Sequence, residues 1–164
     1  MNHILIPTDF SVRSLHLVRY ALNHFSGKNI TVTLFHMIEL PGGITDLLMI
    51  PRERKYLKLM NKNYREGIDM LTNSYGSRIE SIRTQFVFGN RQTIFDQFVT
   101  AQRATVIVFP DNFDLTMPES SSIHPLPFIR KAKIPVVGST INKAFALMDP
   151  HHKAALLEPL AVAG

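Results

Sequence analysis

Uninterrupted hydrophobic runs alternate along the chain with stretches in which apolar residues recur every three or four positions. The runs are short and rich in β-branched and aromatic residues, which is typical of strands that a parallel sheet buries on both faces. They cover residues 4–6, 31–38, 105–109 and 134–138. Residues 81–88 alternate between apolar and polar side chains, so we expect an edge strand there. Pro7 cannot donate a ladder hydrogen bond and marks the end of the first strand.

Helical spacing of apolar residues predicts elements between these strands. A first helix is expected after Ser11, which is a good N-cap, and before Gly27, which is a good terminator. The longest helical signal runs from Pro51 to Gly76, and we expect one helix there with its apolar side on the sheet. Its outer face is basic and carries Lys55, Lys58, Lys62 and Arg65. Two shorter helices are expected over 94–99 and 126–131.

This alternation of strands and helices defines the fold class. We expect an α/β domain over residues 1–140, a doubly wound five-stranded parallel sheet with helices on both faces. The polar stretch 110–122, with Pro118 and three serines, is expected to be irregular. Residues 141–164 are rich in alanine and leucine and form a C-terminal extension, either a helix or a tail.

Composition restricts the class of protein further. The chain has 164 residues, 45% of them hydrophobic, which suits a single globular domain. It has no cysteine, which excludes disulfides and thiolate metal sites. No apolar run has membrane-spanning length and no signal peptide precedes the first strand, so we expect a cytoplasmic protein. The net charge is +5, but the basic residues are dispersed except between Arg52 and Arg65, where a solvated helix face is more expected than a nucleic-acid or membrane partner.

The candidate chemistry lies at the end of the first strand. Pro7, Thr8 and Asp9 fall at the carboxyl edge of the sheet, where open α/β sheets place their ligands. Asp9 has two interpretations: it contacts a ligand, or it caps the turn and the helix that follow, a role that aspartate favours without any ligand. Asp111 and Asp114 offer further carboxylates, so a Mg²⁺ site with Asp9 is a third interpretation.

The seven histidines give no metal signature. No His-x3-His or His-Glu-x2-His pattern occurs, and His151 and His152 are adjacent, a spacing that does not by itself bring two imidazoles to one metal. We expect His16 to be an exposed helix residue and His36 a hydrogen-bonded imidazole within the second strand. No nucleophile elbow, P-loop or dinucleotide motif is present.

Three stretches resemble the universal stress protein family. Residues 4–11 are similar to its opening motif, residues 32–38 to its second strand, and residues 130–137 to its last helix and strand. The similarity covers about residues 1–140 in element order. It implies the strand order 3-2-1-4-5 and a homodimer, often paired through the last strand, which here runs from Ile134 to Gly138.

Many members of that family bind ATP. The resemblance implies that Asp9 and the strand backbone near Met37 surround the adenine, while a glycine-rich loop after the fourth strand wraps the ribose and phosphates. This chain departs from that pattern, because no glycine lies between Gly89 and Gly138. The corresponding segment instead brings three carboxylates, which repel a triphosphate. They are Asp111, Asp114 and Glu119.

A serine run is the remaining argument for phosphate binding, since hydroxyls before a helix can contact an anion. If a nucleotide binds, the residues that hold it are Pro7, Thr8, Asp9, Met37, Ser120, Ser121 and Ser122. Against this, bulky side chains from the same segment can plug the cleft above the first and fourth strands. These are Phe109, Phe113 and Met117.

Three hypotheses of function follow. The first is a dimeric regulatory or interaction module of the stress response that is not an enzyme and has a degenerate ATP site, with no cofactor. The second is a nucleotide-binding stress regulator that holds AMP or ATP at Asp9 and the serine run. The third is an enzyme that acts at the acidic edge formed by Asp9, Asp111 and Asp114.

Overall fold

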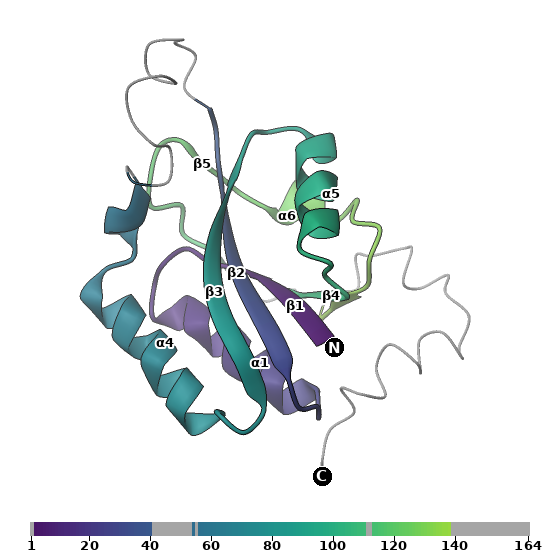
Figure 1. Ribbon diagram of the computed structural model, residues 1–164. Helices are drawn as coiled ribbons and strands as arrows, with labels where there is room; N and C mark the ends of the chain where they lie inside the picture. Colours follow the sequence, from purple (N-terminus) through teal and green to yellow (C-terminus); the bar gives the residue numbers. More distant parts are fainter. Residues whose placement is uncertain (1, 41–53, 55, 111–112, 139–164) are drawn as a thin grey trace.

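One sheet forms the centre of the molecule in the computed structural model, which describes residues 2–40, 54, 56–110 and 113–138 (Figure 1). Its strands are β1 (Asn2–Pro7), β2 (Ile30–Ile38), β3 (Ile79–Phe88), β4 (Val106–Val108), β5 (Ser122–Ile123) and β6 (Val136–Val137). Five of them are parallel and lie in the order β3-β2-β1-β4-β6. Since β6 is the fifth strand that the sequence predicts, the expected 3-2-1-4-5 order is confirmed, and β3 is an edge strand as expected.

The sixth strand was not expected. β5 pairs antiparallel with the end of β2, with Met37 opposite Ile123 and Ile38 opposite Ser122. The prediction of irregular structure through residue 122 is therefore wrong at its last position. Two residues are too few to show a periodic pattern, and their pairing depends on β2 being longer than β1.

Helices cover both faces of the sheet. α1 (His16–His24) and α4 (Lys62–Ser74) lie on one side, and α5 (Gln92–Ala101) and the short α6 (Leu126–Ile129) on the other (Figure 1). Aromatic contacts join the α5 layer to the sheet, because Phe35 of β2 packs against Phe95 and Phe98 of α5. β2 is buried along all nine of its residues, which explains its unbroken hydrophobic character.

The single helix expected from Pro51 to Gly76 is interrupted. A 3-10 turn, η2 (Leu57–Leu59), is followed by Met60 and Asn61 in non-helical conformations before α4 begins. The Asn61 side chain accepts the backbone N–H of Tyr64 at 3.0 Å, so it is the N-cap that starts α4. Residues 51–53 and Lys55 lie outside the described residues.

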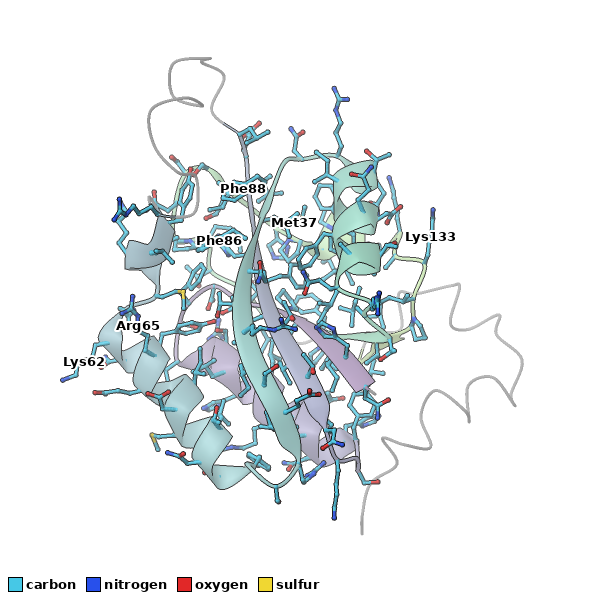
Figure 2. All side chains as sticks on the ribbon, in the orientation of Figure 1. Met37, Lys62, Arg65, Phe86, Phe88 and Lys133 are labelled. Atoms are coloured by element: carbon cyan, nitrogen blue, oxygen red, sulfur yellow. The ribbon has the colours of Figure 1, made fainter. Side chains whose placement is uncertain are left out.

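The basic outer face of this region is confirmed where the structure describes it. Lys58, Lys62 and Arg65 are exposed, and Figure 2 shows Lys62 and Arg65 pointing away from the sheet. Lys58 pairs with Glu119 at 3.6 Å and Lys62 with Glu66 at 3.6 Å, so two of these charges are balanced on the surface.

The first helix begins later than expected, and its carboxyl end receives additional hydrogen bonds from a distant side chain. The Ser11 hydroxyl accepts the N–H of Ser14 at 3.0 Å, but the turn it caps is a 3-10 turn, η1 (Arg13–Leu15), and α1 starts only at His16. At the other end, the Arg78 guanidinium donates to the carbonyls of Leu22, at 2.7 Å, and Phe25. A cation at the carboxyl end of a helix also complements its dipole.

The described part of the chain contains no helix long and apolar enough to cross a membrane. The predicted C-terminal extension, 141–164, lies outside the described residues, and so does the predicted domain boundary at 140. The candidate site is built on the described sheet and the helices packed on its two faces.

Candidate functional site

The chain turns sharply where β1 ends. Phe10 has φ 62°, a left-handed conformation that costs a non-glycine residue about 1–2 kcal/mol. Its ring is only 3% exposed and packs against the rings of His36, Tyr64 and Phe86, with centroids 4.9, 5.4 and 5.6 Å away. Burying a side chain of this size is worth about 1.5–3 kcal/mol, which offsets the conformational cost. The inward Phe10 leaves Asp9 beside it at the sheet edge.

Asp9 is a connector between the end of β1 and a distant segment. One carboxylate oxygen accepts the Ser11 N–H at 3.0 Å and the Ser11 hydroxyl at 2.5 Å, and the other accepts the N–H of Thr116 at 3.0 Å. Burial acts to raise the pKa of Asp9, but these hydrogen bonds outweigh it and hold the pKa below its ordinary value. The carboxylate is thus ionised and has protein donors on both oxygens.

His36 forms a second connection at the same edge. Its Nδ1 lies 2.7 Å from the carbonyl of Thr8 and its Nε2 lies 2.8 Å from the hydroxyl of Ser122. Because a carbonyl only accepts, Nδ1 carries the proton, and neutral Nε2 accepts the Ser122 hydroxyl. That hydroxyl oxygen in turn accepts the N–H of Glu119 at 3.2 Å. Burial lowers the pKa of His36, although the Thr8 bond and the charges of Asp9 and Glu119 act in the opposite direction.

β5 lies directly beyond the end of β1. β3 pairs with β2 as far as Ile38, so one edge of β2 is taken along its whole length. β1 runs along the other edge only as far as Phe35, opposite Pro7. β5 therefore continues along that second edge at Met37 and Ile38. The strand backbone that the resemblance assigns to adenine is paired with the chain itself.

Residues 113–123, which we name the closing segment, lead across this edge into β5 (Figure 1). Leu115 is 5% exposed, and Phe113 and Met117 are partly buried against the same core. The Arg13 guanidinium lies 4.9 Å from the centroid of the Phe113 ring and donates to the carbonyl of Asp114. Apolar side chains of the closing segment, together with buried Phe109, therefore pack against the core of the domain.

The structure brings four of the candidate residues together. Thr8, Asp9, Met37 and Ser122 meet at the carboxyl edge of β1 and β2, as the position of the strand ends predicts. Pro7 ends β1 beside them. Ser120 is exposed, and the carbonyl of Ser121 accepts the N–H of Glu39 at 2.8 Å. Asp111 lies outside the described residues, while Asp114 is exposed.

No protein-family model matches the sequence, and no curated protein matches it. Solved structures do. The hypothetical protein MJ0577 is 18% identical at a TM-score of 0.52, and the match covers 82% of this chain and 92% of that chain. The universal stress protein UspA from Lactobacillus plantarum is 13% identical at a TM-score of 0.46, covering 83% and 95%. A universal stress protein in complex with cAMP is 16% identical at a TM-score of 0.46, covering 83% and 94%.

The chain has a universal stress protein-like fold. The fold expected from the opening motif is confirmed. A likeness at such low sequence identity establishes the fold alone. Within this universal stress protein-like fold, the carboxyl edge of β1 and β2 is the candidate site.

Histidine and acidic side chains do not form a metal site in the part of the chain that the structure describes, where no three of them come together. His16 is exposed and His36 is a hydrogen-bonded core residue, as expected. His151 and His152 lie outside the described residues.

Two residues of this candidate site were not anticipated from the sequence. Thr116 contributes only its backbone N–H, which no side-chain pattern signals. Arg13 binds Phe113 and Asp114, which lie about a hundred positions later in the sequence. A cation four residues after Asp9 was visible in the sequence, but nothing local indicated its partner.

Proposed function

We propose that the chain is a divergent universal stress protein that acts in the cytoplasm as a dimeric interaction or regulatory module. It is not an enzyme, and it does not use ATP or AMP as a cofactor. The carboxyl edge of its sheet is occupied by its own closing segment. Regulation then depends on contacts with other proteins rather than on nucleotide turnover.

One observation carries the proposal. The backbone of Met37 and Ile38 pairs with β5, and the two oxygens of Asp9 accept donors from Ser11 and Thr116. A nucleotide at this edge must replace those hydrogen bonds before it gains any of its own. The glycines whose backbone amides cradle phosphates in ATP-binding relatives are also missing from residues 90–137.

Calorimetry and native mass spectrometry with ATP, ADP and AMP test the absence of a nucleotide site. Each ligand is titrated with and without Mg²⁺ at pH 7.5, and we expect no saturable binding at or below about 100 μM. The control is a known nucleotide-binding universal stress protein treated in the same way. The same samples are assayed for metal-dependent hydrolysis, and we expect none above the rate in buffer.

Micromolar binding that Asp9→Ala abolishes and Asp69→Ala preserves contradicts the proposal and favours the nucleotide-binding alternative. Asp69 is an exposed acid on α4 and so controls for loss of charge. Hydrolysis that depends on Asp114 favours the acidic-edge enzyme instead.

The dimer is proposed to form through β6, the last strand at its edge of the described sheet. The carbonyl of Pro135 accepts the N–H of Ile107 in β4, and the carbonyl of Val137 accepts the N–H of Phe109 just after β4, so both carbonyls point toward that strand. Val136, between them, points its N–H and C=O away from β4, to the side where a strand of a second copy can pair with them. A partner strand here continues the sheet across the dimer.

Val136→Pro removes that outward N–H while leaving the bonds to β4 in place, because edge positions of this kind tolerate proline. We expect sedimentation velocity to show a dimer for the native chain and for the isosteric control Val136→Thr, and a dissociation constant raised at least about tenfold for Val136→Pro. A native chain that sediments as a monomer at high concentration rules out the dimer.

A further inference from the structure

His36 is the residue on which three separate parts of the edge converge. It belongs to β2, its Nδ1–H is donated to the carbonyl after β1, and its Nε2 accepts the hydroxyl of Ser122 in β5. It is 3% exposed, and its ring lies 4.9 Å from that of Phe10. The imidazole thus ties the closing segment to the sheet from inside.

The hydrogen bonds of His36 have a defined direction when its ring is neutral. The Ser122 hydroxyl donates its only proton to Nε2 and uses its oxygen to accept the N–H of Glu119. A protonated imidazole donates from both nitrogens. The Ser122 oxygen then faces two donors, and its own proton loses its acceptor. Protonation of His36 therefore reverses the bond to Ser122, leaves the Ser122 proton without its acceptor, and places a charge on a side chain that is only 3% exposed.

We propose that His36 is a proton-operated latch: protonation of this histidine releases the closing segment and uncovers the carboxyl edge of β1 and β2. The inference rests on the closed edge described under the proposed function and adds its regulation. Opening exposes Asp9 and the backbone of Met37 and Ile38, which lie at the edge where open α/β sheets bind ligands.

The charges around His36 decide how the latch responds. Asp9 at the end of β1 and Glu119 in the closing segment both favour the protonated form, and Lys58 of η2 partly neutralises Glu119 at 3.6 Å. Tyr64, from α4, faces the same cluster and is neutral across this range because burial raises its pKa to about 12. Desolvation opposes all of these acidic neighbours and keeps the pKa of His36 below its ordinary value in the closed state.

The direction of the response follows from linkage. In the open state His36 meets water and returns toward its ordinary pKa of about 6.5, so the open state binds the proton more tightly. Acidification below that value favours opening, by up to about tenfold per pH unit until the pKa of the closed state is passed. At neutral pH the segment stays closed.

A tryptophan reporter tests the latch, since the chain has no tryptophan of its own. Phe113→Trp places one indole under Arg13, where it reports whether the closing segment is docked. Acrylamide quenching is measured from pH 7.5 to pH 5.0 in the full chain with no nucleotide present. Far-UV circular dichroism follows the sheet and helices in the same samples, and NMR titrates the His36 imidazole directly in the wild-type chain.

We expect the quenching constant to rise at least about threefold between pH 7.5 and 5.0 while circular dichroism stays constant. The rise should have its midpoint where NMR shows His36 titrating. It should be absent from His36→Asn, whose amide still donates to Thr8 but takes up no proton. It should persist in His124→Asn, which removes the neighbouring histidine that accepts the N–H of Leu126 at 3.2 Å.

A quenching constant that does not change with pH overturns the latch, and so does a rise that persists in His36→Asn or disappears in His124→Asn. Simultaneous loss of circular dichroism also overturns it, because the chain then unfolds globally. If His36→Asn does not fold, coincidence of the wild-type quenching and NMR midpoints decides. Nucleotide binding at pH 7.5 refutes the proposed function and not the latch, since the reporter is read without nucleotide.

Discussion

Replacing Asp9 by asparagine tests whether its carboxylate stabilises the fold or serves to bind a ligand. The change keeps the size of the side chain and one oxygen but removes the charge. The remaining oxygen is expected to stay with the two donors of Ser11, at 3.0 and 2.5 Å. The new amide group then faces the N–H of Thr116, donor against donor, so the bond to the closing segment is lost.

The magnitude follows from the bonds that change. Removing an acceptor that carries charge costs about 1.5–3 kcal/mol per hydrogen bond, and neutral bonds are about half as strong as charged ones. Thr116 is exposed, so water replaces part of what its N–H loses. We therefore expect Asp9→Asn to lower the free energy of unfolding by about 2–3 kcal/mol at pH 7, a large share of the 5–15 kcal/mol typical of a domain.

Urea unfolding followed by far-UV circular dichroism measures this difference, at pH 7 and at pH 3. The pKa of Asp9 in the folded protein lies below its ordinary value, so its contribution is fully present above about pH 4 and is lost as the pH falls through the folded pKa. The gap between wild type and variant should accordingly narrow in acid. Asp69→Asn, at an exposed position on α4, should stay within about 0.5 kcal/mol of wild type.

A gap smaller than about 0.5 kcal/mol at pH 7 refutes this reasoning. So does a gap that is as large at pH 3 as at pH 7, because a cost that does not depend on the charge of Asp9 comes from packing alone. Either result means that the charge of Asp9 does not stabilise the fold, and it favours the interpretation of Asp9 as a ligand contact.

Three further predictions test other parts of the fold. Arg78→Ala should lower the free energy of unfolding in urea by about 1.5–3 kcal/mol, because the last carbonyls of α1 lose a charged donor, and Arg78→Lys should recover only part of it. Gly89→Ala should lower it by about 1–3 kcal/mol, since Gly89 has φ 135° and an added Cβ meets Ile94 Cδ1 at 2.4 Å. Burial holds the pKa of both His3 and His36 below its ordinary value, so stability in urea should be highest above about pH 6.5 and fall as the pH is lowered from 6.5 toward the folded pKa values.

The sheet could be predicted because each of its parallel strands is indicated by a short local stretch of sequence. Each parallel strand is a short buried run, and the right-handed crossover between such runs leaves few possible orders. The interruption of the predicted helix at Asn61 was also accessible in principle, since asparagine is a strong N-cap. Apolar spacing across the break resembled one helix because Leu57 and Met60 continue the period of Tyr64 and Ile68.

The position of the site could be predicted from the sequence, but the pairing of this edge with the closing segment could not. That Thr8 and Asp9 lie near Met37 follows from where β1 and β2 end. That Ser122 pairs with β2, rather than facing a phosphate, depends on a contact eighty-six positions away that leaves no periodic trace. Non-local pairing of this kind is decided by tertiary packing.

The closed edge has a consequence for any ligand. Buried polar side-chain atoms all have partners among the described residues, so nothing there waits unsatisfied. Entry of a ligand breaks the bonds from Asp9 to Thr116, from His36 to Ser122 and from Glu39 to Ser121. At about 0.5–1.5 kcal/mol for each of the two neutral bonds and about 1.5–3 kcal/mol for the charged bond from Asp9, these reduce the affinity of an otherwise favourable ligand by roughly 70- to 25,000-fold. A ligand with micromolar intrinsic affinity then binds weakly at neutral pH, and a partner that engages this edge must either supply equivalent hydrogen bonds or act when the closing segment is already open.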